Sequence, residues 1–206
     1  MVEISEAPEP VHEHVHHGHH AEGDGFRRLA AIYVGVVAML LAIASLGGGH
    51  VTKEMLTANI QASDAYAFAQ AKYLRATAYQ LAADQMEFEI NQLPGLADSG
   101  KAEAAKRIAS YRDNAARYES DPASGEGRRE LLAKAKQLER LRDHAAEQDP
   151  NFEFAAALFQ IAIVLGSVAI VAASRALLGI SGVLSLAAIA LTINGYFLVV
   201  PLPLAG

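Results

Sequence analysis

The chain has 206 residues, of which 52% are hydrophobic, and it carries a formal net charge of −6 at pH 7. It contains no cysteine, which excludes disulfides, thiolate metal sites and cysteine nucleophiles. Nucleic-acid binding requires a concentration of Lys and Arg that this acidic chain lacks, so we expect no nucleic-acid partner.

Residues 1–25 form a polar tail rich in histidine, proline and glycine. Apolar side chains that could offset the entropy of ordering are almost absent, so the composition predicts disorder. Closely spaced imidazoles can jointly hold Zn, Ni or Cu, although nothing selects one metal. Incidental metal affinity of a low-complexity tail is the alternative, and a pH-responsive tail is physically allowed, since imidazole titrates near about pH 6.5. The candidate ligands are His12, His14, His16, His17, His19 and His20. We expect no other cofactor.

The next segment, 26–49, contains an uncharged apolar run from Leu29 to Leu46. A bilayer core about 30 Å thick needs roughly 20 apolar residues, so this run predicts a first transmembrane helix. Arg27 and Arg28 precede the run, and a small-residue triplet near its end resembles a signal-peptide cleavage site, so a cleaved Sec or Tat signal is the alternative. The long acidic, His-rich segment before the run is unlike a basic n-region, which favours the span.

Residues 50–150 carry most of the charge and contain no comparable apolar run, which predicts a soluble helical domain. No Gly or Pro interrupts residues 52–93, and apolar residues recur there at seven-residue steps, as in a packed helix seam. The expected seam consists of Ile60, Ala67, Leu74, Leu81 and Phe88, with Ala71 and Ala78 in a second row.

Two shorter helices are expected next, at about 101–119 and 127–148, and Pro150 predicts the end of the second. The first helix rises about 60 Å and the two shorter ones together about 61 Å, so the outward and returning lengths cancel. The sequence therefore predicts an antiparallel, coiled-coil-like hairpin. Its returning seams are Ala104, Ile108, Tyr111, Ala115 and Tyr118, then Leu131, Ala135, Leu138, Leu141 and Ala145.

Such alanine-rich seams bury little apolar area per layer, which makes the hairpin a candidate for self-association into a homo-oligomer. Four tyrosines either fill layers between subunits or broaden the core within one chain. They are Tyr66, Tyr73, Tyr79 and Tyr111.

Two further transmembrane helices are expected at 151–174 and 176–200, followed by a short tail, 201–206. The fold class is therefore an all-α membrane protein with three spans in the lipid bilayer. Asn194 is a strongly polar side chain inside the third expected span, and we expect it to form an interhelical hydrogen bond. Small residues at four-three spacing predict tight packing of all three spans. They are Ala31, Gly35, Ala38, Ala42 and Ser45; Ala162, Gly166, Ala169 and Ala173; and Ser181, Ser185, Ala188, Thr192 and Gly195.

Three arginines decide the expected orientation. Arg27 and Arg28 lie just before the first span, and Arg175 lies in the turn between the second and third. The positive-inside rule then places the N-terminus in the cytoplasm. Residues 50–150 would be periplasmic, in a bacterial inner membrane.

Short motifs at the boundaries of the spans resemble the bacterial membrane family labelled domain of unknown function 4337. They are Ala44-Ser-Leu-Gly-Gly-Gly-His50, the run from Ser63 to Lys72, and Asp149-Pro-Asn-Phe-Glu-Phe154. The resemblance implies the three-span architecture and brings no known activity. We expect family-like positions to couple the soluble domain to the spans, namely His50, Asp64, Gln70, Lys72 and Asp149.

No Walker A loop, nucleophile elbow or His-Glu metalloprotease pair is present, so we expect no enzyme activity. The expected spans lack the intramembrane carboxylates and histidines of ion pathways. A homo-oligomeric pore is therefore the least favoured of the three functions considered. The favoured function is a structural or adaptor protein that self-associates or docks an unknown protein partner. A metal- or pH-responsive membrane protein that senses through its His-rich tail is the alternative.

Overall fold

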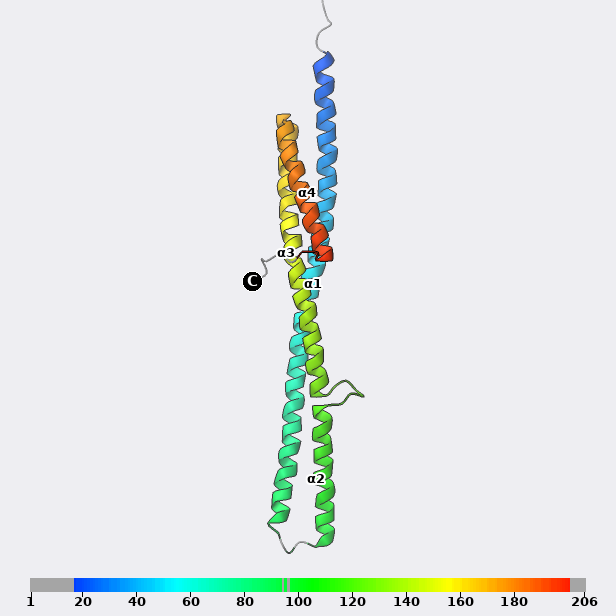
Figure 1. Ribbon diagram of the computed structural model, residues 1–206, viewed down its shortest axis with the longest axis vertical. Helices are drawn as coiled ribbons and strands as arrows, with labels where there is room; N and C mark the ends of the chain where they lie inside the picture. Colours follow the sequence, from blue (N-terminus) through cyan, green and yellow to red (C-terminus); the bar gives the residue numbers. More distant parts are fainter. Residues whose placement is uncertain (1–16, 94, 96, 201–206) are drawn as a thin grey trace, which may run out of the picture. The chain divides into compact units, whose positions relative to one another are not determined.

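The structure is a computed structural model that describes residues 17–93, 95 and 97–200. Within these ranges the chain forms four helices and no strands, which confirms the all-helical class (Figure 1). The helices are α1 (His17–Asn91), α2 (Asp98–Glu119), α3 (Arg128–Ala172) and α4 (Arg175–Phe197). As expected, three of them, α1, α3 and α4, are long and apolar enough to cross a membrane.

Two helix ends differ from the expectation. α1 begins at His17, inside the tail that the composition predicts to be disordered, because a helix propagates from an existing helical segment more easily than it nucleates.

α3 continues through Pro150, where we expected a helix end. Proline removes the donor for the carbonyl of Ala146, yet Asn151 and Phe152 directly after it are 0% and 2% exposed, and Ala145 before this turn is 1% exposed. Packing of the flanking turns therefore outweighs the local cost.

The chain divides into two compact units. The first unit contains the chain up to Gly47 together with Asn151–Val200, and the second unit contains Gly48–Pro150. Helices α1 and α3 each contribute a segment to both units.

In the first unit, segments of α1, α3 and α4 share one apolar core. The small residues of the second and third expected spans are mostly buried in it, including Gly166 and Ser185, so these two faces pack as predicted. A Cβ atom on Gly166 would lie only 2.8 Å from Val34 Cγ2, so this approach requires a glycine. The fully buried core residues are Val37, Ala44, Ala155, Phe159, Ala162 and Ala188.

The small face of the first expected span, by contrast, does not pack within this unit. Ala31, Gly35, Ala38, Ala42 and Ser45 are all exposed. The face of α1 that the unit buries consists instead of Ala30, Val37, Ala44 and Gly47. The prediction of a buried small face is therefore wrong for this helix. The core is filled instead by the larger Val37 together with Ala30 and Ala44 on the other side of α1.

A polar cluster links the three segments of the first unit. The Tyr33 hydroxyl lies 2.9 Å from Ser181 Oγ and 2.8 Å from Ser185 Oγ, while Ser181 donates to the carbonyl oxygen of Ala162 at 2.6 Å. Each of these hydroxyls therefore has a hydrogen-bond partner within the protein.

In the second unit, contacts pair α1 with α2 and α3 running in the opposite direction. Thr52 on α1 donates to Asp149 at 2.9 Å, and Tyr66 donates to Glu139 at 3.0 Å. Farther along α1, the Tyr79 ring lies 5.7 Å from that of Tyr118, and Glu87 pairs with Arg112. As residue numbers rise along α1, the partner numbers fall, and Figure 1 shows α2 beside the last turns of α1.

The face of α1 that packs in the second unit is made of alanines. Buried positions follow strict four-three spacing: Ala58, Ala62, Ala65, Ala69, Ala76 and Ala83, with Lys72 and Tyr79 half-buried in the same row. The predicted seam is therefore wrong for α1, because Ile60, Leu74 and Leu81 point away from the neighbouring helices and are at least 60% exposed. Alanine lets helix backbones approach closely, which branched side chains at these positions would prevent.

The returning helices bury the faces that their spacing predicts. All five expected α2 positions are buried or half-buried, and so are Leu131, Ala135, Leu138 and Ala145 on α3. Leu141 is the exception, with 50% of its surface exposed.

Charged side chains join the end of α2 to the start of α3. Nε and Nη2 of Arg128 each donate to the Glu119 carboxylate at 2.7 Å, and the Glu130 carboxylate accepts from Ser120 Oγ at 2.7 Å. A Cβ atom on Gly127 would clash with this carboxylate, so the junction requires glycine there. The junction is therefore built from specific contacts and does not behave as an open linker.

Candidate interaction surface

An apolar surface lies along α1 on the side opposite the buried alanines. We call it the outer stripe; it consists of Leu56, Ile60, Ala67, Ala71, Leu74, Ala78, Leu81 and Phe88, all exposed. The five large members expose 55–66% of their surface. Seven residues complete two turns with a drift of only about 20°, so positions seven apart stay on one side of a helix. The second unit thus presents a row of exposed apolar side chains, interrupted by Asp64 and Gln85, whose large members are not buried by the described part of the unit.

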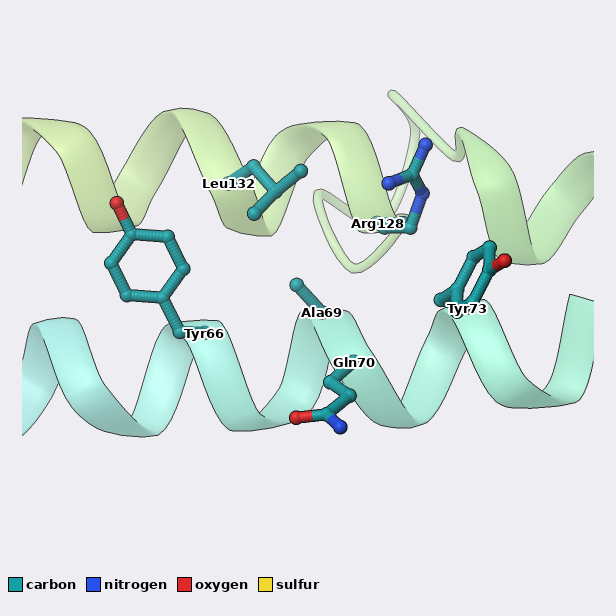
Figure 2. A pocket seen from close by; sticks show the side chains of 6 residues that line it. All are labelled: Tyr66, Ala69, Gln70, Tyr73, Arg128 and Leu132. Carbon is teal, nitrogen blue, oxygen red and sulfur yellow. The ribbon is translucent and has the colours of Figure 1, made fainter.

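Cavities of the second unit lie between α1 and the helices that pair with it. One of about 310 Å³ is lined by Tyr66, Ala69, Gln70, Tyr73, Arg128 and Leu132. Figure 2 shows Tyr66 reaching from α1 toward α3 and Arg128 lying over Tyr73, with its guanidinium carbon 5.5 Å from the ring centroid. Because Arg128 is already engaged by Glu119 and Tyr73, this cavity offers no free cation to a ligand.

The four tyrosines singled out by the sequence all contact groups of their own unit. Tyr66 donates to Glu139, Tyr73 lies under Arg128, and Tyr79 lies 5.8 Å from Tyr111 between ring centroids. The half-buried Tyr79 and Tyr111 broaden the core within one chain, whereas Tyr66 and Tyr73 are exposed and contact it from the surface.

The five residues expected to couple the two domains do not form one cluster. Asp149 accepts the hydrogen bond from Thr52, and Lys72 lies 3.5 Å from Glu126. His50 lines a separate cavity with Leu138 and Leu141, Asp64 is exposed, and Gln70 points away from α3 in Figure 2. Their coupling role stays a prediction.

The expected metal ligands fall at the edge of the structure. His12, His14 and His16 lie outside the described residues, and His17, His19 and His20 lie in α1 at positions whose side chains are not described. Elsewhere in the described part of the chain, no group of three His, Asp or Glu side chains is arranged to hold a metal ion.

The junction between α2 and α3 predicts a sensitivity to acid. Arg128 lowers the pKa of Glu119 below its ordinary value of 4.5, and the Ser120 hydroxyl lowers the pKa of Glu130. A carboxyl whose pKa is lowered by folding stabilises the fold above its ordinary pKa and loses that contribution as the pH falls through the folded value.

We therefore expect the thermal midpoint of the purified protein in detergent, followed by circular dichroism, to fall below about pH 4.5. Glu119→Gln should lower the midpoint at pH 7 and weaken its dependence on acid. Glu103→Gln is the matched control, since Glu103 is exposed and lies 3.8 Å from Arg107 on its own helix. An unchanged acid dependence in Glu119→Gln would contradict this assignment.

Comparison with known proteins adds one finding. A family model described as domain of unknown function, DUF4337, matches residues 26–198. No curated protein and no solved structure matches the chain.

Proposed function

The chain belongs to this family, whose description assigns no activity, and from that premise we propose a non-enzymatic integral membrane protein that docks a protein partner or self-associates. The outer stripe is the observation that supports the proposal. A row of large exposed apolar side chains is typical of interaction sites.

The proposed architecture assigns one task to each unit. The first unit anchors the protein in a bacterial inner membrane through three spans, in keeping with the three helices that are long and apolar enough to cross a bilayer. The second unit is an antiparallel, coiled-coil-like hairpin that presents the outer stripe. Arg27, Arg28 and Arg175 favour a cytoplasmic N-terminus and a periplasmic second unit.

The alternative, a metal- or pH-responsive protein, depends on the His-rich tail. Removal of residues 1–25 separates the two functions, because a docking protein keeps its assembly without the tail, whereas a sensor loses its response to metal.

Thiol labelling tests the docking surface and the orientation together, because the chain contains no cysteine of its own. Leu74→Cys lies on the outer stripe, and Thr77→Cys, three residues away, is exposed and borders the stripe without belonging to it. In intact cells, an impermeant maleimide should label Thr77→Cys readily and Leu74→Cys roughly tenfold more slowly, because a partner covers the stripe.

Both variants should label equally after denaturation. Equal labelling in intact cells would contradict the docking surface. Labelling of Thr77→Cys only after the cells are opened would instead place the second unit in the cytoplasm and reverse the proposed orientation.

A further inference from the structure

We infer that the outer stripe packs against the same stripe of a second copy, with the two α1 helices parallel and in register. This inference rests on the proposed docking function and names its partner. It is carried by two separate exposed faces of α1, one in each unit.

The first face is the outer stripe itself. Its large residues recur every seven positions, which is the period at which one helix packs along another. Residues 56–88 extend about 50 Å along a helix about 10 Å wide, so a matching pair covers about 1,000 Å² in total, near the lower limit for a specific interface. A helix with the same period fits this surface, and a second copy of the chain supplies one.

The second face is the row of small residues on the first expected span, Ala31, Gly35, Ala38, Ala42 and Ser45, which the first unit leaves exposed. The equivalent faces of the second and third expected spans are mostly buried against neighbouring helices. The row on the first span is therefore the small face that the described part of the first unit leaves uncovered. In lipid, close helix approach over small residues replaces the hydrophobic effect as the cause of association. A soluble partner cannot cover this face, whereas a second copy covers both faces with one helix.

Membrane insertion sets the direction of the pair. Every copy enters the bilayer with the same orientation, so the first spans of two copies can pair only in parallel. α1 is a single helix from His17 to Asn91, and we therefore assign the parallel, in-register arrangement to its whole length. The row from 31 to 45 adds about 22 Å of contact, which raises the total to roughly 1,400 Å².

One residue opposes this arrangement and so tests it. Asp64 lies one helical turn after Ile60, in the same row as Ala71 and Ala78 of the outer stripe, and is exposed. In a parallel, in-register pair the two Asp64 carboxylates come close to each other, and like charges at such positions weaken association. Asp64→Asn removes this repulsion and should strengthen the association of two copies. No contact within the described part of the second unit of a single chain predicts that the same substitution stabilises the monomer.

Disulfide formation in intact membranes is the direct experiment. Single variants Ile60→Cys, Leu74→Cys and Leu81→Cys should each form a disulfide-linked dimer of the full chain under mild oxidation, because each position meets its own counterpart. Asn59→Cys and Thr77→Cys, which are exposed but outside the stripe, are the controls and should form roughly tenfold less dimer. Two differently tagged copies, expressed together, identify the linked species as this chain alone.

Two further variants act without disturbing a single chain. A Cβ atom on Gly35 meets nothing within 4 Å, so Gly35→Leu fits the first unit but fills the small face. It should lower the yield of Leu74→Cys dimer roughly tenfold, and Asp64→Asn should raise it. Unchanged yields in both variants would overturn the inference.

The outcomes distinguish this inference from the function on which it rests. Protection of Leu74→Cys from maleimide without any homodimer would leave docking intact and assign the stripe to a different protein, which overturns the inference. A homodimer at only one of the three stripe positions would overturn the parallel register. Free labelling with no dimer would remove both proposals.

Discussion

Replacing Phe152 with alanine is expected to lower the free energy of unfolding of the first unit by about 3–5 kcal/mol. Phe152 is 2% exposed, and its ring meets that of Tyr196 edge-on with 4.9 Å between centroids. Two glycines make room for it, since a Cβ atom on Gly47 or Gly195 would approach the ring to 2.5 Å or 2.9 Å. Truncation therefore leaves a cavity bordered in part by the backbone at these two glycines, which cannot collapse readily.

Phe154→Ala provides the matched control, because it removes the same atoms two residues away from a side chain that is 45% exposed. We expect it to cost less than about 1 kcal/mol. Unfolding of the purified protein in mixed micelles, followed by circular dichroism as the fraction of SDS rises, measures both changes. Equal losses in the two variants would show that Phe152 has no special place in the core.

The second large effect is expected at Asn194. Its amide nitrogen donates to Asn151 Oδ1 at 2.7 Å and to the carbonyl of Val200 at 2.8 Å, while its oxygen accepts from the Val200 amide at 2.9 Å. Asn151 is fully buried. Asn194→Leu should therefore cost about 1–3 kcal/mol, because it removes these bonds and leaves buried polar groups in an apolar setting.

A double-mutant cycle with Asn151→Leu isolates the bond between the two side chains. The double variant should be more stable than the sum of the single losses implies, with a coupling energy of about 1 kcal/mol, which is the usual scale for hydrogen bonds between membrane helices. The same SDS titration measures all four proteins. Strict additivity would mean that the two asparagines stabilise the unit independently.

The helical class and the three apolar helices follow from hydropathy and periodicity alone, whereas the packing face of α1 does not. That helix carries two apolar faces, and the pattern with the larger side chains, Ile60 to Phe88, is more conspicuous. The face that packs in the second unit was visible as unbroken four-three spacing from Ala58 to Ala83, but a periodicity argument weighted by hydrophobicity ranks alanine low. Size complementarity with α2 and α3, which the spacing does not encode, decides between the two faces.

Asn194 and Pro150 likewise depend on packing that the local sequence does not encode. The sequence predicted an interhelical hydrogen bond for Asn194, and the structure supplies Asn151 as the partner, which lies 43 positions earlier in the chain. Pro150 predicts a helix end from local preference, yet α3 is continuous and buries Ala145 before it and Asn151 after it. The candidate surface itself was present in the sequence as the row Ile60 to Phe88, and only the packing of the other face shows that this row is free.

The opposed course of α1 against α2 and α3 has a consequence for the order of folding. Glu87 and Arg112 are separated by 25 positions, Tyr66 and Glu139 by 73, and Thr52 and Asp149 by 97. Closing a loop of 97 residues costs about 1.2 kcal/mol more in chain entropy than closing one of 25. Each contact, once formed, shortens the loop that remains for the next. We therefore expect the second unit to close progressively from Glu87 and Arg112 toward Thr52 and Asp149, so that its most distant pairing forms last.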